Sequence, residues 1–162
     1  MNQQVLKAKQ DVVNEIVGKA KENATLVVAE YRGLTVRQIQ ELRRALRTEN
    51  SELCVYKNSL VERAVKELGY EGCDEILSGP NAFIFSKEAT NGPKVVAKYA
   101  KRFGGTLVIK GGIVEGQFAN EATIKEIAKL PGKEGMISMF LSCLQAPIRQ
   151  FAATVKAVAD AK

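Results

Sequence analysis

Hydrophobic positions along this chain of 162 residues follow two alternating periodicities. Residues 4–22 place apolar side chains three and four positions apart, with lysines opposite, which predicts a helix with one buried face. The next segment, TLVVAEY at 25–31, is almost continuously apolar in its middle and predicts a buried strand. The alternation of helix and strand patterns continues to residue 130 and predicts helices packed against a sheet, in a strand order that stays open.

The later elements are predicted from the same patterns and from turn and capping residues. They are helices at 35–49, 59–69, 93–103 and 120–130, strands at 52–57, 82–86 and 106–114, a short helix or turn at 72–78 and a turn at 78–81. Two helices are expected to begin with a capping box, Thr35 with Gln38 and Ser59 with Glu62. The helix after Thr35 is expected to bury Val36, Ile39, Leu42 and Leu46. The two glycines inside the strand at 106–114 suggest a bulge or a bend.

Pro131 and Gly132 end this alternation. We expect a hinge at 131–134 and a helix over 135–162 that is interrupted once, at Pro147. Apolar side chains recur along it at helical spacing, namely Met136, Ile137, Phe140, Leu141 and Leu144, then Ile148, Phe151, Val155 and Val158. The predicted fold class is α+β. An α/β-type N-terminal domain over 1–130, with about four strands and flanking helices, precedes an extended C-terminal helical arm kinked near Pro147.

Composition limits the kinds of function. Apolar residues make up 46% of the chain and charged residues 26%, which is ordinary for a folded protein, and the net charge of +6 is spread without a basic tail. Nucleic acid would therefore bind a patch on a folded surface. The chain has no His, and its three Cys lack a C-x-x-C spacing. We expect no cofactor, metal site, small-molecule substrate or membrane span, no signal peptide, and reduced thiols in a cytoplasmic protein.

One candidate binding site combines YRGLT at 31–35 with YKNS at 56–59, because each follows a predicted strand and precedes a capped helix. If the two strands run parallel, both ends meet at one edge of the sheet. Two helix N-termini, Arg32 and Lys57 would then offer amides and charge to a chain of phosphates. Gly33 would permit close approach, and Asn58 would supply a donor and an acceptor. Alternatively, both helices have ordinary caps and the charges are simply solvated.

The apolar stripe of the C-terminal helix allows two interpretations. It could pack on its own domain, as most amphipathic helices do. However, the preceding domain already completes its alternation before Pro131, and Pro147 divides the stripe into two similar segments, about 136–145 and 148–159. Two similar segments are what two copies of one helix-in-groove site would need.

Five stretches, in order along nearly the whole chain, are similar to one known family. They are YRGLTVRQIQELRRALR (31–47), VYKNSLVERAV (55–65), SGPNAFIFS (78–86), VIKGGIVEG (108–116) and the LPGKE junction (130–134). By these motifs the chain resembles the bacterial stalk-base family, ribosomal protein ten of the large subunit. Pro147 departs from a straight, continuous terminal helix.

The resemblance implies a structural ribosomal protein and not an enzyme. Its N-terminal domain would bind large-subunit ribosomal RNA beside a neighbouring stalk-base protein, and its arm would hold dimers of the acidic stalk protein, two by the length of this arm. These dimers would support recruitment of translation GTPases. The family's RNA-binding motifs fall on Arg32–Gly33, Lys57–Asn58 and Gly79–Pro80, and the patch would extend to Arg37, Arg43 and Arg44. The nine apolar arm residues named above, Met136 to Val158, would contact the stalk protein.

Two other classes of function compete with this interpretation. A protein-only adaptor built on the terminal helix predicts no affinity for RNA. An α/β enzyme acting on a phosphate ligand would need a compact pocket with acid–base groups, and the sequence offers neither His nor an evident carboxylate pair. Its glycines at 111, 112 and 116 match neither phosphate-loop spacing.

Overall fold

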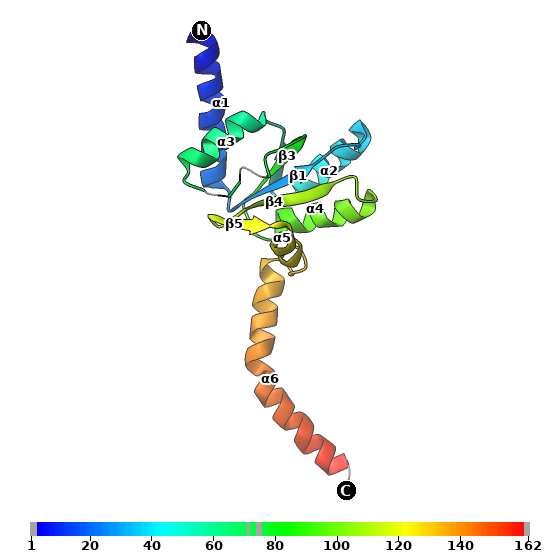
Figure 1. Ribbon diagram of the computed structural model, residues 1–162. Coiled ribbons are helices and arrows are strands. Elements are labelled where there is room, and N and C mark those ends of the chain that lie inside the picture. The colour runs from blue at the N-terminus through cyan, green and yellow to red at the C-terminus, as the bar shows by residue number, and fades with distance from the viewer. Residues whose placement is uncertain (1–2, 71, 74–75, 161–162) are drawn as a thin grey trace. The chain divides into compact units, whose positions relative to one another are not determined.

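The computed structural model describes residues 3–70, 72–73 and 76–160 (Figure 1). The chain divides into two units, Met1–Lys129 and Leu130–Lys162. The helices are α1 (Gln3–Glu22), α2 (Val36–Thr48), α3 (Asn58–Glu67), α4 (Asn91–Arg102), α5 (Glu121–Ile127) and α6 (Lys133–Asp160). The strands are β1 (Thr25–Glu30), β2 (Ser51–Cys54), β3 (Asn81–Ser86), β4 (Val108–Val114) and β5 (Gln117–Asn120).

The described strands of the first unit form one sheet in the order β2-β3-β1-β4-β5, with all neighbours antiparallel. β1 is central, and β3 separates it from β2. Because both β1 and β2 run antiparallel to β3, they run in the same direction as each other. The predicted α+β class is confirmed. The expected count of about four strands was one short, since QFAN at 117–120 pairs with β4 as a fifth strand.

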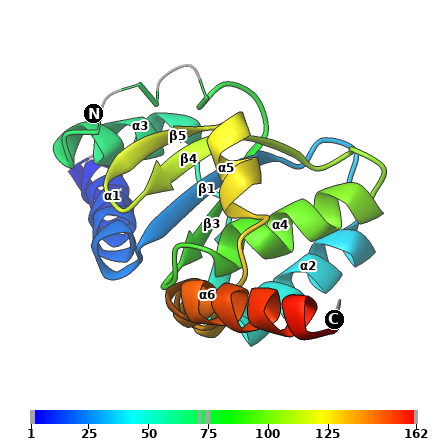
Figure 2. The ribbon, with the colours of Figure 1, turned by 90° about the horizontal axis from the view of Figure 1, so that it is seen from below.

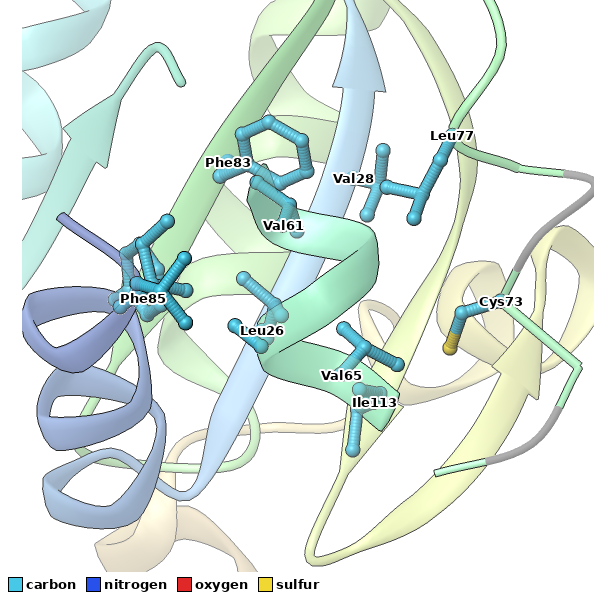
Figure 3. Packing of buried hydrophobic residues seen from close by; sticks show 12 residues of the cluster. Leu26, Val28, Val61, Val65, Cys73, Leu77, Phe83, Phe85 and Ile113 are labelled. Atoms are coloured by element: carbon cyan, nitrogen blue, oxygen red, sulfur yellow. The ribbon is translucent and has the colours of Figure 1, made fainter. Parts of the chain in front are cut away.

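Residues on opposite faces of the sheet belong to two separate hydrophobic cores. Leu26 and Val28 of β1 pack with α1 and α3, whereas Val27 and Ala29 pack with α2, α4 and α5. Figure 2 shows α1 and α3 on one side of the sheet and α2 and α4 on the other. In Figure 3, Val61 of α3 lies in the first core with Leu26 and the two phenylalanines of β3. Each large side chain that is fully buried contributes roughly 1.5–3 kcal/mol.

The two predicted capping boxes have different outcomes. The first is confirmed: the Thr35 amide donates to the Gln38 side chain at 2.8 Å, and the Gln38 amide donates to the Thr35 hydroxyl at 3.4 Å. The second was wrong, because Lys57 occupies the cap position of α3, two residues before Ser59. Val36 was also misplaced: it is 72% exposed at the first position of α2, before the apolar stripe turns inward.

The bulge suggested by the glycines of β4 is present. Val28 pairs with Gly111 and Ala29 with Ile109, so Lys110 is the extra residue opposite β1. Beside it, Gly112 lies so close to β1 that a Cβ would stand 2.2 Å from the Leu26 carbonyl oxygen. A side chain at this position would collide with the backbone of the central strand.

The second unit consists mainly of α6, a helix of 28 residues that includes Pro147. No side chain between Lys133 and Asp160 is buried. The helix continues through Pro147, so the expected interruption is a bend within one helix: its axis changes direction in the orange part of Figure 1. Proline lacks the amide that would bond to the preceding turn, which accounts for a bend there.

Candidate nucleic-acid interface and helical arm

Several chain segments meet at one edge of the sheet. β1 and β2 both end there, because they run in the same direction, and β3 and β4 both begin there, because they run antiparallel to β1. The condition for a shared edge is therefore met, although β3 lies between the two strands that were expected to form a simple crossover. We call this edge the loop edge: residues 31–35, 55–58, 78–80 and 105–107.

Hydrogen bonds connect three of these segments. The Asn58 side chain donates to the Gly79 carbonyl oxygen at 2.8 Å, and the Tyr31 amide donates to the Pro80 carbonyl oxygen at 3.4 Å. The three sequence motifs at 32–33, 57–58 and 79–80, which are far apart in the chain, are thus neighbours in the fold. Gly79 has a φ of +82°, a left-handed conformation that favours glycine, so the turn needs this residue type.

A lysine of β4 holds the 78–80 turn in place. Lys110, the bulge residue of that strand, donates to the Ser78 carbonyl oxygen at 2.6 Å and forms an ion pair of 2.9 Å with Glu30 at the end of β1. Sequence reasoning missed both Lys110 and Glu30. The available signal was a lysine in the middle of an otherwise apolar strand, next to two glycines.

The charged groups of the loop edge face outward. Arg32 and Lys57 are exposed, as is Arg37 in the adjoining first turn of α2, and among the described residues no ion pair engages them. Lys57 occupies the cap position of α3 without a capping bond from its side chain. Leu60 donates to the Lys57 carbonyl oxygen at 2.9 Å, so it is the amides of Asn58 and Ser59 that stay available to an acceptor. An exposed anion such as phosphate would meet both positive charge and free donors here.

Arg43 and Arg44 are exposed on α2 but lie away from the loop edge. They follow Arg37 by six and seven residues, which places them about 10 Å further along the helix. The structure therefore brings Arg32, Gly33, Lys57, Asn58 and the Gly79–Pro80 turn together, while the two arginines form an extension along α2. Thr106 is a further residue at the edge, its methyl carbon 3.9 Å from the position of a Cβ on Gly33.

A polar cluster ties the segment at 55–58 to α1. The Tyr56 hydroxyl donates to Glu15 at 2.8 Å, and Lys19 lies 3.1 Å from both Glu15 and Glu52. Burial, followed by the bond to Glu15, raises the pKa of Tyr56. The hydrogen bond from Tyr56, followed by that from Lys19, lowers the pKa of Glu15. The cluster fixes the backbone just before Lys57 without using Lys57 itself.

The second candidate surface is the arm stripe, which we define as the nine apolar side chains from Met136 to Val158 on α6. All nine are exposed, from 42% at Met136 to 74% at Ile148. Large apolar side chains that are left in water along a whole helix mark an interaction surface. The Pro147 bend separates the five residues that end at Leu144 from the four that begin at Ile148.

Other chemistry has little support among the described residues. Cys54, Cys73 and Cys143 form no disulfide with one another there. No group of three or more Cys, Asp or Glu side chains within the described ranges could hold a metal ion. None of the helices that the structure describes has the length and apolar character needed to cross a membrane.

Comparisons with known proteins agree with this two-part organisation. Residues 4–103 match a family model described as ribosomal protein L10, and residues 130–162 match one described as the ribosomal protein uL10 C-terminal region. The chain is 47% identical to the large ribosomal subunit protein uL10 of Macrococcus caseolyticus, over 99% of this chain and 93% of that protein. It is 43% identical to the protein of the same name from Bacillus licheniformis, over 97% of this chain and 95% of that protein.

Proposed function

Because this chain belongs to the ribosomal protein L10 family, we propose that it forms the base of the stalk on the large ribosomal subunit. Members of this family are structural ribosomal proteins and not enzymes. In our proposal the domain over 1–130 binds large-subunit ribosomal RNA, residues 131–134 form a hinge, and the arm over 135–162 anchors dimers of the acidic stalk protein. These dimers in turn support the recruitment of translation GTPases.

The main support for RNA binding is the convergence of distant motifs at the loop edge. Arg32 and Lys57 supply unpaired charge, and Asn58 holds the Gly79–Pro80 turn against the start of α3. Phosphate groups spaced along an RNA backbone suit such a row of separate donors better than a single small anion does. Arg37 extends the row at the first turn of α2, and Arg43 with Arg44 would contact a longer stretch of RNA.

The support for stalk-protein binding is that every residue of the arm stripe is exposed. Two helical segments on either side of Pro147 offer two similar apolar faces, and we propose one acidic dimer on each. The partner would enclose the stripe as a groove encloses an amphipathic helix. A neighbouring stalk-base protein beside the RNA-binding domain completes the proposed set of partners.

The remaining alternative is a protein-only adaptor, because the exposed arm stripe could bind partner proteins without any contact between the chain and RNA. The two proposals differ in whether RNA binds. We would measure the affinity of the full chain for a large-subunit ribosomal RNA fragment at several salt concentrations. Arg32→Ala with Lys57→Ala should weaken binding and reduce the salt slope by about one for each phosphate that loses its cation. Lys7→Ala with Lys9→Ala, at exposed positions of α1, should change neither.

Each outcome decides between the proposals. An unchanged affinity and salt slope for the variant with Arg32→Ala and Lys57→Ala would reject the loop edge as the RNA-binding surface. If the unaltered chain bound no RNA, only the protein-only adaptor would remain.

For the arm, native mass spectrometry of the chain with the acidic stalk protein should give one chain with two dimers. Removal of residues 133–162 should abolish the complex, whereas a bare monomer with the full chain would reject the carrier role.

A further inference from the structure

A groove in the first unit lies between α4 and α5, over the beginning of β4. Its volume is about 890 Å³. We call it the α4–α5 groove, and its lining residues fall within 94–101, 104–109 and 121–129. None of the nine residues proposed to bind ribosomal RNA lines it, whereas Gly105 and Leu107 belong both to the groove lining and to the loop edge. The groove is therefore a site distinct from those nine residues.

The walls of the groove are strongly basic. Lys94, Lys98 and Lys101 follow one another on α4 at spacings of four and three, which puts them on one face of that helix. Lys125 and Lys129 stand on the α5 side, four residues apart. Among the described residues that line the groove, Glu121 is the one acidic side chain, and it is already paired with Lys125. All five lysines are exposed, so their charges face whatever enters.

The floor of the groove is apolar. Leu107, Val108 and Ile109 contribute to its lining; Leu107 and Ile109 are almost fully buried, and Val108 is 45% exposed. Alanines from both helices, Ala97, Ala100 and Ala128, widen this surface because their side chains are short. An occupant that covered the floor would remove apolar area from water, which is favourable at about 25 cal/mol per Å².

We propose that the α4–α5 groove binds an acidic amphipathic helix of a partner protein. An apolar stripe on that helix would cover Val108 and its neighbours, and carboxylates on both flanks would meet the lysines of α4 and α5. RNA fits less well, because phosphates would satisfy the lysines and leave the floor in water. The chain's own α6 lacks the required acidic flanks, since Lys133, Arg149 and Lys156 outnumber Glu134 and Asp160 along it.

The test uses the full chain and a fluorescent synthetic peptide. The peptide has about 18 residues, long enough to form a helix, with leucines on one face and glutamates on both flanks. Fluorescence anisotropy should show saturable binding, and Lys98→Glu with Lys125→Glu should weaken it about tenfold or more. Lys7→Glu with Lys9→Glu makes the same change in net charge on exposed residues of α1 and should leave the affinity within about twofold.

Two further probes distinguish binding in the groove from binding elsewhere on the chain. A peptide of the same composition in scrambled order keeps the charge but loses the apolar stripe, and it should bind much more weakly. Amide chemical shifts on titration should move within 94–109 and 121–129. Three results would each overturn the proposal. The scrambled peptide could bind as tightly as the designed one, the chemical-shift changes could be confined to 136–158, or an RNA oligonucleotide could displace the peptide from these lysines. The absence of saturable binding would overturn it as well.

Discussion

The side-chain amide of Asn58 donates a hydrogen bond of 2.8 Å to the carbonyl oxygen of Gly79, 21 residues further along the chain. Asn58 is the first residue of α3, and Gly79 belongs to the turn before β3. The bond therefore joins two loops of the proposed RNA-binding surface, and it uses one of the two N–H donors of the Asn58 side chain. Asn58 acts here by positioning the turn.

Asn58→Ala should weaken RNA binding although it removes no charge. Loss of the bond frees the Gly79–Pro80 turn, and it should lower the free energy of unfolding by about 0.5–1.5 kcal/mol. Asn58→Asp should weaken RNA binding further, since a carboxylate would face the Gly79 carbonyl oxygen and repel phosphate. Ser59→Ala, at the exposed neighbouring position, is the control. Urea denaturation and RNA titration measure both effects, and full RNA affinity in Asn58→Ala would exclude the positioning role.

A structural feature could be predicted from the sequence when the residues that cause it are close together in the chain. The Thr35–Gln38 box was predictable because both partners lie within one helical turn. The Ser59–Glu62 pair has the same spacing, yet the cap of α3 lies two residues earlier, where the Asn58 side chain is held by Gly79 from outside the segment. That competing bond comes from a distant part of the chain and leaves no local pattern.

Strand order and the short fifth strand depend on long-range pairing in the same way. β5 has only four residues, too few for a clear alternation, and its turn rests on positive φ values at Glu115 and Gly116. The candidate RNA-binding motifs could be named from sequence, but their meeting at one edge depends on β3 lying between β1 and β2. The Lys110–Glu30 pair appears only when β4 is aligned with β1.

Phe151→Asp should remove one acidic dimer and leave the other. Phe151 is 72% exposed and lies in the arm stripe beyond Pro147, so its charge would disturb the second proposed segment alone. Gln150→Asp introduces the same charge at an exposed position outside the stripe and should retain both dimers. Native mass spectrometry counts the dimers. Retention of both by Phe151→Asp would contradict the two-segment arrangement.

Two glycine substitutions should shift stability in opposite directions. Gly112→Ala forces a Cβ to within 2.2 Å of the Leu26 carbonyl oxygen, a backbone atom of the central strand, and should lower the free energy of unfolding by more than about 2 kcal/mol. Gly18→Ala lies inside α1, where the new Cβ would meet nothing within 4 Å beyond the adjacent residues and the backbone of its own helix, and should raise it by about 0.5–1 kcal/mol. Thermal and urea denaturation compare them. Equal effects would mean that β1 and β4 are further apart at Gly112 than the structure shows.

Glu15 should contribute stability that depends on pH. Its pKa in the folded protein is lowered by the Tyr56 hydroxyl and then by Lys19, so folding favours the ionised form. The contribution is present above the ordinary glutamate pKa and is lost as pH falls through the lower pKa of the folded state. Glu15→Gln should therefore reduce stability at about pH 7, by less than about 1 kcal/mol because the carboxylate is half exposed.

Urea denaturation of both proteins at about pH 7 and about pH 2 checks this dependence. The difference between Glu15→Gln and the unaltered chain should disappear at the lower pH. A difference that stays constant would show that the carboxylate charge is not involved. Glu22→Gln, at an exposed position of the same helix, should show no comparable loss at neutral pH.

The position of β1 at the centre of the sheet has a consequence for the order of events during synthesis. The first strand to leave the exit tunnel is the middle strand of the five, and its two partners follow only at residues 81–86 and 108–114. The nascent chain must keep the apolar residues of β1 unpaired until more than half of the polypeptide has emerged, since such long-range pairing cannot begin earlier. Lys110 holds the 78–80 turn and is among the last parts of the loop edge to be synthesised, so the proposed RNA-binding surface is complete only when translation of this domain is nearly finished.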